Sequence, residues 1–456
     1  MTMEDWRGKK VLVIGAGKSG LAASRYLAEK GAKVVLADQK EAPAFEQPVA
    51  SLVPPGVELI LGGYPALETG GFDLVVLSPG VPPSLPVVVQ ARALGIPVTG
   101  ELELAFRQAR APVVAITGTN GKTTTTALTG QIFREAGIKT LVAGNIGRPF
   151  IAEVEGYGPR DAIVLEVSSF QLETADTFRP RVAAVLNITP DHLDRHGTME
   201  AYVAAKARIF ARQTEEDVTV LNFDDPLTRG LASRCPGRVV FFSRREDLAE
   251  GAFLRDGWIT VKERGKTYPL LPAGDLPLPG LHNLENALAA VACAWWWGIT
   301  GEKIAAALRR FPGVPHRLEL VAEINGVAYV NDSKGTNPEA SIRALEAFDR
   351  PIVLIAGGRN KGSDFTAFAQ VVKKKARALV VLGECAAQVA EAARVAGMSE
   401  VYRASDLREA VLTAHRLARP GDVVLLSPAC ASWDMFKNYE ERGDRFKEIV
   451  RELAGA

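Results

Sequence analysis

The sequence predicts an α/β fold, in which strands of parallel sheets alternate with helices. Short runs rich in valine, isoleucine and leucine recur along the chain, and amphipathic stretches with helical spacing separate them. Such runs, when they end in glycine, proline or serine, are typical of strands buried on both faces of a parallel sheet. The runs are KKVLVIG, AKVVLAD, DLVVLSPG, PVVAITG, DAIVLEV, VAAVLNI, RPIVLIAGG, ALVVLG and GDVVLLSP. This is more strands than one sheet holds comfortably.

Chain length and the positions of breaks in the strand–helix pattern predict three domains. The 456 residues exceed the roughly 150 of a typical domain about threefold. The alternating pattern breaks near Gly100, before the helical run ELELAFRQA, and near Gly313, in RRFPGVPHR. We therefore expect a Rossmann-like domain, a central P-loop ATPase domain with a mainly parallel sheet, and a second Rossmann-like domain. Their predicted ranges are 1–100, 101–313 and 314–456. The least regular stretch, 243–279, contains the candidate strands WITV and TYPLL.

Composition excludes several classes of function. The 54 basic and 53 acidic residues create no overall field that would attract nucleic acid or an anionic membrane. Four widely spaced cysteines without a CxxC pair provide neither a zinc site nor a disulfide framework. The first residues do not resemble a signal peptide, and no run approaches the roughly 20 apolar residues of a spanning helix. We expect a cytoplasmic protein, neither inserted in a membrane nor bound to nucleic acid, that holds small anionic ligands by local geometry.

The first glycine-rich loop is GAGKSG, from Gly15 to Gly20, between the strand VLVI and the helix LAASRYLAEKG. Asp38 ends the next strand. In this context the glycines permit a tight turn and a close backbone approach, and the helix N-terminus favours a phosphate group. The loop therefore predicts a nucleotide diphosphate site, with a purely structural turn as the alternative.

The second loop, AITGTNGKTTT, is more specific. Backbone N–H groups from Gly118 to Gly121 would cradle phosphates, Lys122 would reach the terminal ones, and the Thr123 hydroxyl would bind Mg²⁺. Two residues separate its glycines, where the common P-loop has four. An ordinary glycine turn before a helix is the alternative, but the Lys-Thr pair favours an ATP site.

The motif TGTNGKT resembles the ATP loop of the Mur ligases and of the related folylpolyglutamate synthases. The strings LEVSSFQLE, NITPDHLDRHG, AYVAAKARIF and GLHNLENALAA follow it in the order that Mur ligases show. The chain is therefore similar to the Mur ligase family over essentially its whole length, and least so over about residues 41–70 and 230–275.

The resemblance implies a magnesium site that the residue types alone would not establish. Glu166, at a strand end beside the ATP loop, is a natural Mg²⁺ ligand. His192 in isolation indicates a structural residue, and Lys206 a solvated one. By resemblance Glu166 and His192 bind Mg²⁺, and Lys206 becomes a carbamate whose anionic oxygens replace an ammonium that binds no metal. The implied metal ligands, for two ions, are Thr123, Glu166, His192 and carbamylated Lys206.

The resemblance also implies nucleotide and substrate sites. Asn283 and Asn286 share one helical face, where their amides suit an adenine or ribose edge, with capping or core packing as the alternative. The implied ATP site is Gly118, Thr119, Asn120, Gly121, Lys122, Thr123, Thr124, Asn283, Asn286, Arg317 and Asp332. The implied UDP-substrate site is Gly15, Gly17, Lys18, Ser19, Gly20, Asp38, Ser78, Pro79, Gly80, Asn145, Ser168 and Gln171. The implied catalytic residues are Lys122, Glu166, His192, Lys206 and Lys334.

Two C-terminal strings, NDSKGTNPEA and LSPACASWDMFKNYEERGDRF, resemble those of the family members that add D-glutamate. The implied D-glutamate residues are Thr336, Lys361, Ser432, Trp433 and Tyr439. Tyr439 stands where some relatives have phenylalanine, and Trp433 is a second departure. A monomer that joins D-glutamate to UDP-N-acetylmuramoyl-L-alanine with ATP, through an acyl phosphate, in peptidoglycan precursor synthesis, is the function that the resemblance implies.

Three alternatives remain at this point. A nicotinamide-dependent dehydrogenase would use Gly15, Gly17, Gly20 and Asp38, but it leaves the TGTNGKT loop without a purpose. A nucleotide-binding regulator would bind ATP and release no phosphate. A folylpolyglutamate synthase would share the ATP loop, but it would lack the N-terminal domain and the DHLDRHG string.

Overall fold

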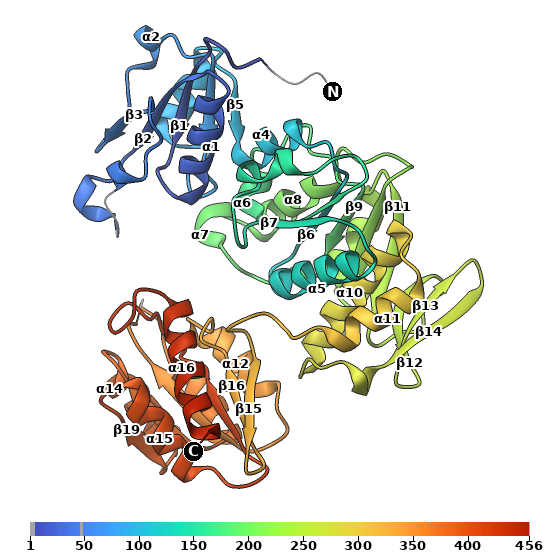
Figure 1. The fold of residues 1–456 in the computed structure, drawn as a ribbon, viewed down its shortest axis with the longest axis vertical. Helices are drawn as coiled ribbons and strands as arrows, with labels where there is room; N and C mark the ends of the chain where they lie inside the picture. Colours follow the sequence, from blue (N-terminus) through green and yellow to red (C-terminus); the bar gives the residue numbers. More distant parts are fainter. Residues whose placement is uncertain (1–4, 46–48, 361, 456) are drawn as a thin grey trace. The chain divides into compact units, whose positions relative to one another are not determined.

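The computed structural model describes residues 5–45, 49–360 and 362–455. Its internal contacts divide the chain into two compact units. The first unit runs to Asp275 and includes 285–310, and the second comprises 276–284 and 311–456. Three sheets, formed mostly by parallel strands, confirm the predicted α/β class (Figure 1).

The N-terminal sheet has five parallel strands in the order β3-β2-β1-β4-β5. Their bounds are β1 Lys10–Ile14, β2 Lys33–Asp38, β3 Glu58–Leu61, β4 Leu74–Leu77 and β5 Val98–Gly100. Alternate residues of β1 point to opposite faces of the sheet. Val11 and Val13 pack against helix α1 (Lys18–Glu29), while Leu12 and Ile14 pack toward α2 (Leu67–Gly70) and α3 (Pro86–Ala93). The chain reverses direction along the sheet at β1 and β4, where α/β folds bind ligands.

The nine-stranded central sheet has the order β14-β13-β12-β11-β10-β9-β6-β8-β7. Pairing is parallel from β7 to β12 and antiparallel from β12 to β14. The strands are β6 Val113–Thr117, β7 Thr140–Gly144, β8 Ala162–Glu166, β9 Val182–Val185, β10 Val218–Asn222, β11 Arg238–Ser243, β12 Gly251–Arg255, β13 Trp258–Glu263 and β14 Lys266–Pro272. WITV and TYPLL therefore form the antiparallel edge.

Helices cover both faces of the central sheet. They are α4 Glu101–Gln108, α5 Lys122–Glu135, α6 Ser169–Leu172, α7 Leu193–His196, α8 Met199–Ala207, α9 Pro226–Gly230, α10 Leu281–Trp297 and α11 Gly301–Arg310. Helix α5 packs on β7, β8 and α11. Buried glutamates tie α4 to the central domain: Glu103 accepts hydrogen bonds from the N–H groups of Asp176, Thr177 and Phe178, and Glu101 accepts one from Ile151.

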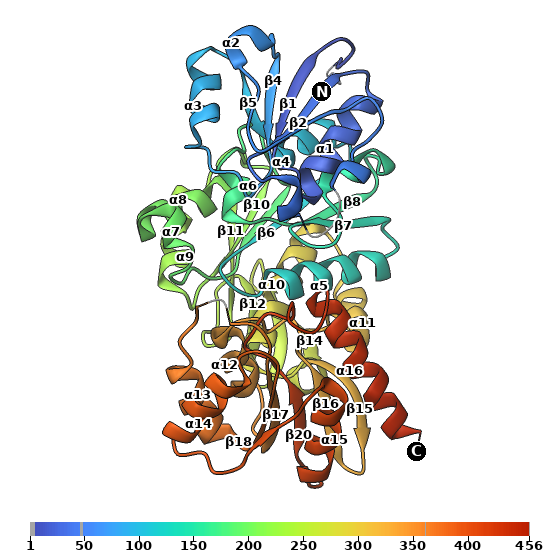
Figure 2. The same ribbon diagram turned by 90° about the vertical axis from the view of Figure 1, so that its left-hand side faces the viewer.

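The C-terminal sheet has the order β15-β16-β20-β17-β18-β19, parallel except for the β15–β16 hairpin. Its strands are β15 Glu319–Ile324, β16 Val327–Asn331, β17 Ile352–Gly357, β18 Ala376–Leu382, β19 Val401–Arg403 and β20 Val423–Leu426. Helices α12 Pro338–Glu346, α13 Thr366–Lys375 and α14 Ala386–Val395 cover one face, and α15 Leu407–Leu417 and α16 Tyr439–Ala454 cover the other (Figure 2). Over the described ranges, we find no helix with the length and apolar character that crossing a bilayer requires.

Candidate active site

The first glycine-rich loop has the tight turn that its sequence predicts. Gly15 has φ +98°, and a Cβ on Gly20 would lie 1.8 Å from the Gly15 oxygen. Only glycine therefore fits at position 20. The Ser78 hydroxyl donates to that same oxygen at 2.8 Å, which joins the loops after β1 and β4.

Asp38 fastens this loop through its carboxylate, which accepts hydrogen bonds from the N–H groups of Ala16 (2.8 Å) and Lys40 (2.9 Å). Gly17 and Gly80 are exposed, and no atom lies within 4 Å of where their Cβ atoms would be. Their backbones are thus open to a ligand. Lys18 and Ser19 begin α1, and Pro79 precedes Gly80 in the β4 loop.

The second loop joins β6 to α5 and is shaped by the segment after β9. Gly121, in the left-handed conformation (φ +84°), caps α5. Asn187 donates to the Asn120 oxygen and accepts from the Asn120 N–H, at 3.1 and 2.8 Å. The Thr119 N–H donates to the Asn187 oxygen at 2.9 Å. Thr123 and Thr124 are buried in the first turn of α5.

Helix α10 approaches the same loop through Asn286. A Cβ on Gly121 would lie 2.1 Å from the Asn286 Oδ1, and the Thr125 hydroxyl lies 3.4 Å from that oxygen. Asn283, one turn earlier in α10, donates from its amide to the Pro279 oxygen at 2.7 Å.

Two lysine ammonium groups converge on the loop. The Nζ of Lys122 donates to the carbonyl oxygens of Gly118 and Thr119, and the Nζ of Lys206 donates to the Gly118 oxygen, each at 2.8 Å. Lys206 is only 1% exposed. Burial first, and then the charge of Lys122, hold the pKa of Lys206 well below its usual value. An anion bound here would offset the repulsion between these like charges.

A carboxylate lies at the same edge of the sheet. Glu166 ends β8, next to β6, and its Oε1 accepts a hydrogen bond from the Asn145 amide at 2.8 Å. Its buried Oε2 has no hydrogen-bond partner. Such an orphaned oxygen beside a phosphate loop fits a divalent cation. The parts of the chain that the structure describes hold no cluster of three or more histidine, cysteine, aspartate or glutamate side chains able to bind a metal. Among these residue types Glu166 would have at most one companion, such as His192, and the other ligands would be a hydroxyl, phosphates, water or a carbamate.

The other residues predicted for this region are either exposed or already engaged in a helix cap. His192 is exposed in a left-handed conformation (φ 52°), beside Asp191 and the ring of Phe170. Ser168 and Gln171 form the capping box of α6 with each other. Their side chains thus already have a structural use, and any substrate contact would come in addition.

Sequence reasoning missed three participants, two in the DHLDRHG string and one, Tyr202, in the AYVAAKARIF string. The charge of Asp191 acts on Lys206 and favours its protonated form. Arg195 donates to the oxygens of Gly80 (3.1 Å) and Val81 (3.1 Å), and so fastens the central domain to the β4 loop. The Tyr202 hydroxyl pairs with Thr119 at 3.2 Å. The signal available for Asp191 and Arg195 was their presence in the same charged string as His192.

The second unit brings several predicted residues to the ends of β16 and β20. Asp332 is buried and accepts hydrogen bonds from the Ser427 hydroxyl at 2.7 Å and the Leu318 N–H at 3.3 Å. Burial raises its pKa to about 7, an effect that Ser427 and the charge of Arg317 oppose. The Lys334 ammonium lies 5.5 Å from the centre of the Tyr439 ring.

The predicted D-glutamate residues are only partly described. Ser432 is buried, Trp433 is 51% exposed, and the Thr336 N–H donates to the Lys334 oxygen at 2.9 Å. Lys361 lies outside the described residues.

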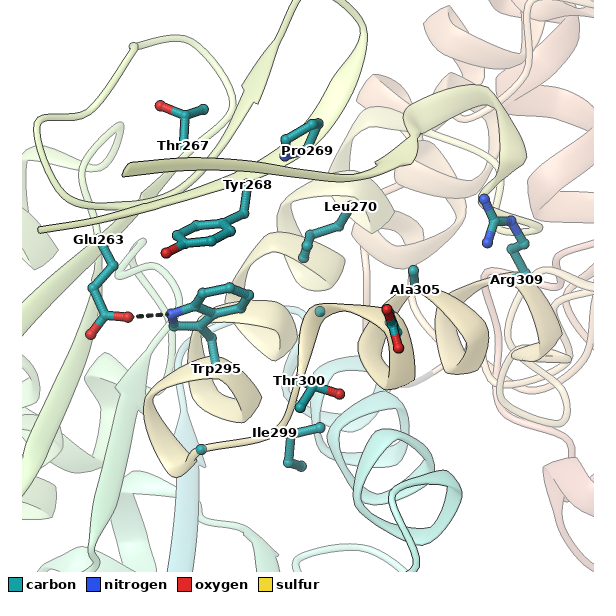
Figure 3. Close-up of a pocket in the computed structure, with 13 residues that line it drawn as sticks. Glu263, Thr267, Tyr268, Pro269, Leu270, Trp295, Ile299, Thr300, Ala305 and Arg309 are labelled. Atoms are coloured by element: carbon teal, nitrogen blue, oxygen red, sulfur yellow. Dashed lines mark hydrogen bonds between the residues drawn. The ribbon is translucent and has the colours of Figure 1, made fainter. Parts of the chain in front are cut away.

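A pocket of about 930 Å³ lies in the first unit, where β14, α10 and α11 meet. Figure 3 shows Tyr268 and Trp295 side by side, with the Trp295 N–H bonded to Glu263. None of the predicted site residues lines this pocket. The candidate site is thus defined by the loops at the strand ends.

Family models match the chain in three segments. The "Mur ligase MurD-like, N-terminal domain" matches residues 9–100. The "Mur ligase middle domain" matches 116–294, and the "Mur ligase, glutamate ligase domain" matches 316–430.

Two curated relatives match over nearly their full lengths. A UDP-N-acetylmuramoylalanine--D-glutamate ligase of Pelotomaculum thermopropionicum is 61% identical over 451 residues, which are 99% of each chain. The protein of the same name from Desulfitobacterium hafniense is 50% identical over 443 residues, 97% of each chain.

Solved structures show the same fold at lower identity. The UDP-N-acetylmuramate-alanine ligase of Thermotoga maritima superposes with a TM-score of 0.62 at 21% identity, covering 98% of this chain and 100% of that one. A pseudomurein peptide ligase type C from Methanothermus fervidus has a TM-score of 0.57 at 20% identity, with the same coverage. Together with the models and the full-length relatives, these findings establish that the chain belongs to the Mur ligase family.

Proposed function

We propose that this chain is an ATP-dependent ligase that joins D-glutamate to UDP-N-acetylmuramoyl-L-alanine and releases ADP and phosphate. The names of full-length relatives at 61% and 50% identity support this substrate pair. Peptidoglycan precursor synthesis is the pathway in which that product belongs. A monomer in the cytoplasm, with a role in cell shape and division, remains part of the proposal.

The observation that carries the proposal is the convergence of Lys122 and Lys206 on the Gly118 oxygen. The Lys122 cation and the N–H groups of a glycine-rich loop before a helix form an anion site, and the buried nitrogen of Lys206 lies beside it. The reaction requires one, because an anionic substrate carboxylate must approach the anionic triphosphate of ATP.

The proposed chemistry proceeds in two steps. The substrate carboxylate attacks the γ-phosphoryl group of ATP, which gives ADP and an acyl phosphate. The amine of D-glutamate then attacks the acyl carbon, phosphate leaves, and the amide forms with loss of a proton. The acyl phosphate is needed because a carboxylate is a poor electrophile. Lys122 would stabilise charge on the migrating phosphoryl group, and Lys334 would approach the reacting groups.

Magnesium, in the proposal, is held by Thr123, Glu166, His192 and carbamylated Lys206. The unpartnered Oε2 of Glu166 supports this assignment. Bound there, two Mg²⁺ ions would neutralise phosphate charge. The buried, weakly basic Lys206 supports the carbamate, because a neutral amine is the form that adds carbon dioxide.

We further propose that the three predicted ranges divide the substrates. Residues 1–100 would bind the UDP portion through Gly17, Gly80 and their neighbours, and 101–313 would bind ATP. Residues 314–456 would bind D-glutamate through Thr336, Lys361, Ser432, Trp433 and Tyr439, while Arg317 and Asp332 contribute to the nucleotide site.

The test is phosphate release from ATP in the presence of UDP-N-acetylmuramoyl-L-alanine and one amino acid at a time. D-glutamate should support turnover, while L-alanine, L-lysine, diaminopimelate and D-alanyl-D-alanine should not. Equal rates with another of these would overturn the assignment of the amino acid. NADH fluorescence that changes on mixing would instead favour a dehydrogenase.

A further inference from the structure

Two buried thiols, outside the machinery proposed above, meet between loops of the C-terminal sheet. Cys385 precedes α14, just after β18, and Cys430 follows β20. Their sulfur atoms are 2.9 Å apart, and each residue is 2% exposed. Both are free thiols. Strand β17 lies between β18 and β20, so the two cysteines come from loops on either side of the loop that follows β17.

Backbone contacts hold these loops together on both sides of the pair. The Cys385 N–H donates to the Gly358 oxygen at 2.9 Å. Arg359 and Ala431 exchange N–H···O bonds of 2.9 and 3.0 Å. The Glu384 N–H donates to the Asp434 carboxylate at 2.9 Å. The sulfur atoms are therefore kept adjacent by the fold.

The two thiols differ in acidity, which assigns them different chemical roles. The hydrogen bond between the two sulfur atoms lowers the pKa of Cys385 and raises that of Cys430. Cys385 also stands at the N-terminus of α14, where the helix favours negative charge. The buried guanidinium of Arg442 donates to the Cys430 carbonyl at 3.3 Å and its charge lowers the pKa of Cys430, while the charge of Asp434 raises the pKa of both thiols.

We propose that Cys385 and Cys430 form a modification site, at which a hydroperoxide converts the two thiols into an intramolecular disulfide. The Cys385 thiolate attacks one peroxide oxygen, the O–O bond breaks, and a sulfenic acid and water form for hydrogen peroxide. The Cys430 sulfur then attacks the sulfenic sulfur, its proton leaves, and a second water is expelled. Two thiols lose two electrons and two protons, and one peroxide gains them.

Burial and spacing determine which oxidant fits. The thiols are enclosed, so a small uncharged peroxide reaches them more readily than a bulky charged disulfide. Since a disulfide bond is about 2.05 Å long, the sulfur atoms need to approach by only about 1 Å. A thiol reductant would reverse the reaction.

The consequence rests on the proposed function. Ser432 and Trp433 follow Cys430 by two and three residues, so a disulfide would fix the segment that carries them. Because bond formation draws Cys430 toward Cys385, we expect the KM for D-glutamate to rise severalfold in the oxidised enzyme. The KM for ATP should stay unchanged.

The experiment treats the full chain with hydrogen peroxide, alkylates the remaining thiols, and maps the peptides by mass spectrometry. We expect a peptide pair linked through Cys385 and Cys430, which separates on reduction. Cys235, whose pKa burial raises to about 11, should remain an alkylatable thiol. Overoxidation of Cys385 without a linked pair, or alkylation of both residues, would overturn the proposal.

Matched variants separate the bond from general damage. Cys385→Ser and Cys430→Ser should form no link and keep the same D-glutamate KM after peroxide, whereas Cys235→Ser should behave as the wild type. A linked enzyme with an unaltered D-glutamate KM would overturn the functional consequence. Peptide mapping needs no turnover, so a reduced enzyme that ignores D-glutamate would refute the proposed function while leaving the disulfide site intact.

Discussion

At the residue scale, the site depends on ionisable groups that are wholly or partly buried beside the phosphate loop. Lys122 and Lys206 share the Gly118 oxygen, and Glu166 presents one unpartnered oxygen at the next strand end. A buried charge is costly alone, and it becomes favourable once an oppositely charged ligand is bound. Single substitutions here should therefore affect catalysis more than folding.

Lys122→Ala should reduce D-glutamate-dependent phosphate release by about 100- to 1,000-fold, because one preorganised stabilising group is lost. Lys122→Met keeps the apolar stem, so an equal loss in this variant assigns the effect to the charge. Steady-state phosphate assays measure both. Activity within about tenfold of the wild type would refute the phosphate-loop assignment.

Lys206→Ala should lose activity that short carboxylates or added bicarbonate partly restore, because a carbamate is the proposed active form. Lys206→Arg keeps a positive charge but forms no carbamate, so it should fail like alanine. Phosphate release with and without added acetate distinguishes the two ideas. An active Lys206→Arg enzyme would show that a cation suffices.

Glu101 should make stability depend on pH. Burial raises its pKa to about 7, opposed by the N–H groups of Ile151 and Phe150. A raised carboxyl pKa contributes stability that is complete below its unfolded value of about 4.3 and is lost as the pH rises through about 7. Glu101→Gln removes this titration. Relative to the wild type, the variant should therefore gain on the order of 2 kcal/mol of unfolding free energy between about pH 5 and pH 8.

Urea unfolding at both pH values measures this difference. A difference that does not change with pH would show that Glu101 titrates normally in the folded chain.

Sequence reasoning at this scale reached the residues whose motif has a mechanism and missed those that act through tertiary contacts. Lys122 was predicted from its loop alone. Lys206 appeared to be a solvated helix residue, and only the family resemblance indicated a role in the site; its burial was not predicted, since helical spacing does not reveal what covers a face. Asp191 and Arg195 were overlooked because their partners, Lys206 and Gly80, lie far away in the sequence.

At the element scale, helix α5 joins the phosphate loop to the core, and its two ends offer a matched comparison. Gly121 precedes it with φ +84°, and Gly137 follows it with φ +83°. An alanine Cβ at 121 would meet the Asn286 oxygen at 2.1 Å, whereas at 137 it would meet nothing within 4 Å. Alanine at either position therefore meets the same backbone strain, but only alanine at 121 also meets a steric clash.

Gly121→Ala should lower kcat/KM for ATP by about 100-fold, because a displaced loop misaligns the phosphates. Gly137→Ala should cost about 1 kcal/mol of stability and leave kcat/KM unchanged. ATP titrations and thermal unfolding of both variants make the comparison. Equal kinetic losses would mean that the left-handed conformation, and not the loop position, is responsible.

The elements themselves were largely predictable. All nine apolar runs became strands, because burial on both faces requires continuous apolar sequence. The antiparallel edge from β12 to β14 was harder to predict from the sequence. In β13, Ile259 and Val261 are buried, while Trp258 is exposed. Half-exposed strands alternate polar and apolar residues over a short length, and that signal is weak.

At the scale of the whole molecule, three sheets place their loops at the carboxyl ends of parallel strands, where α/β proteins bind ligands. The order of strands within each sheet did not follow from the sequence, because pairing is set by contacts between distant segments. The proposed reaction draws on residues of both compact units. Its central claim is that ATP activates the substrate carboxylate before D-glutamate attacks.

The most direct test uses UDP-N-acetylmuramoyl-L-alanine with heavy oxygen in its terminal carboxylate. The wild-type enzyme is incubated with ATP and D-glutamate, and the released phosphate and the nucleotide product are analysed by mass spectrometry. We predict one heavy oxygen in each phosphate, matched by one new amide to D-glutamate. Unlabelled phosphate, or phosphate release that does not depend on D-glutamate, would contradict the account.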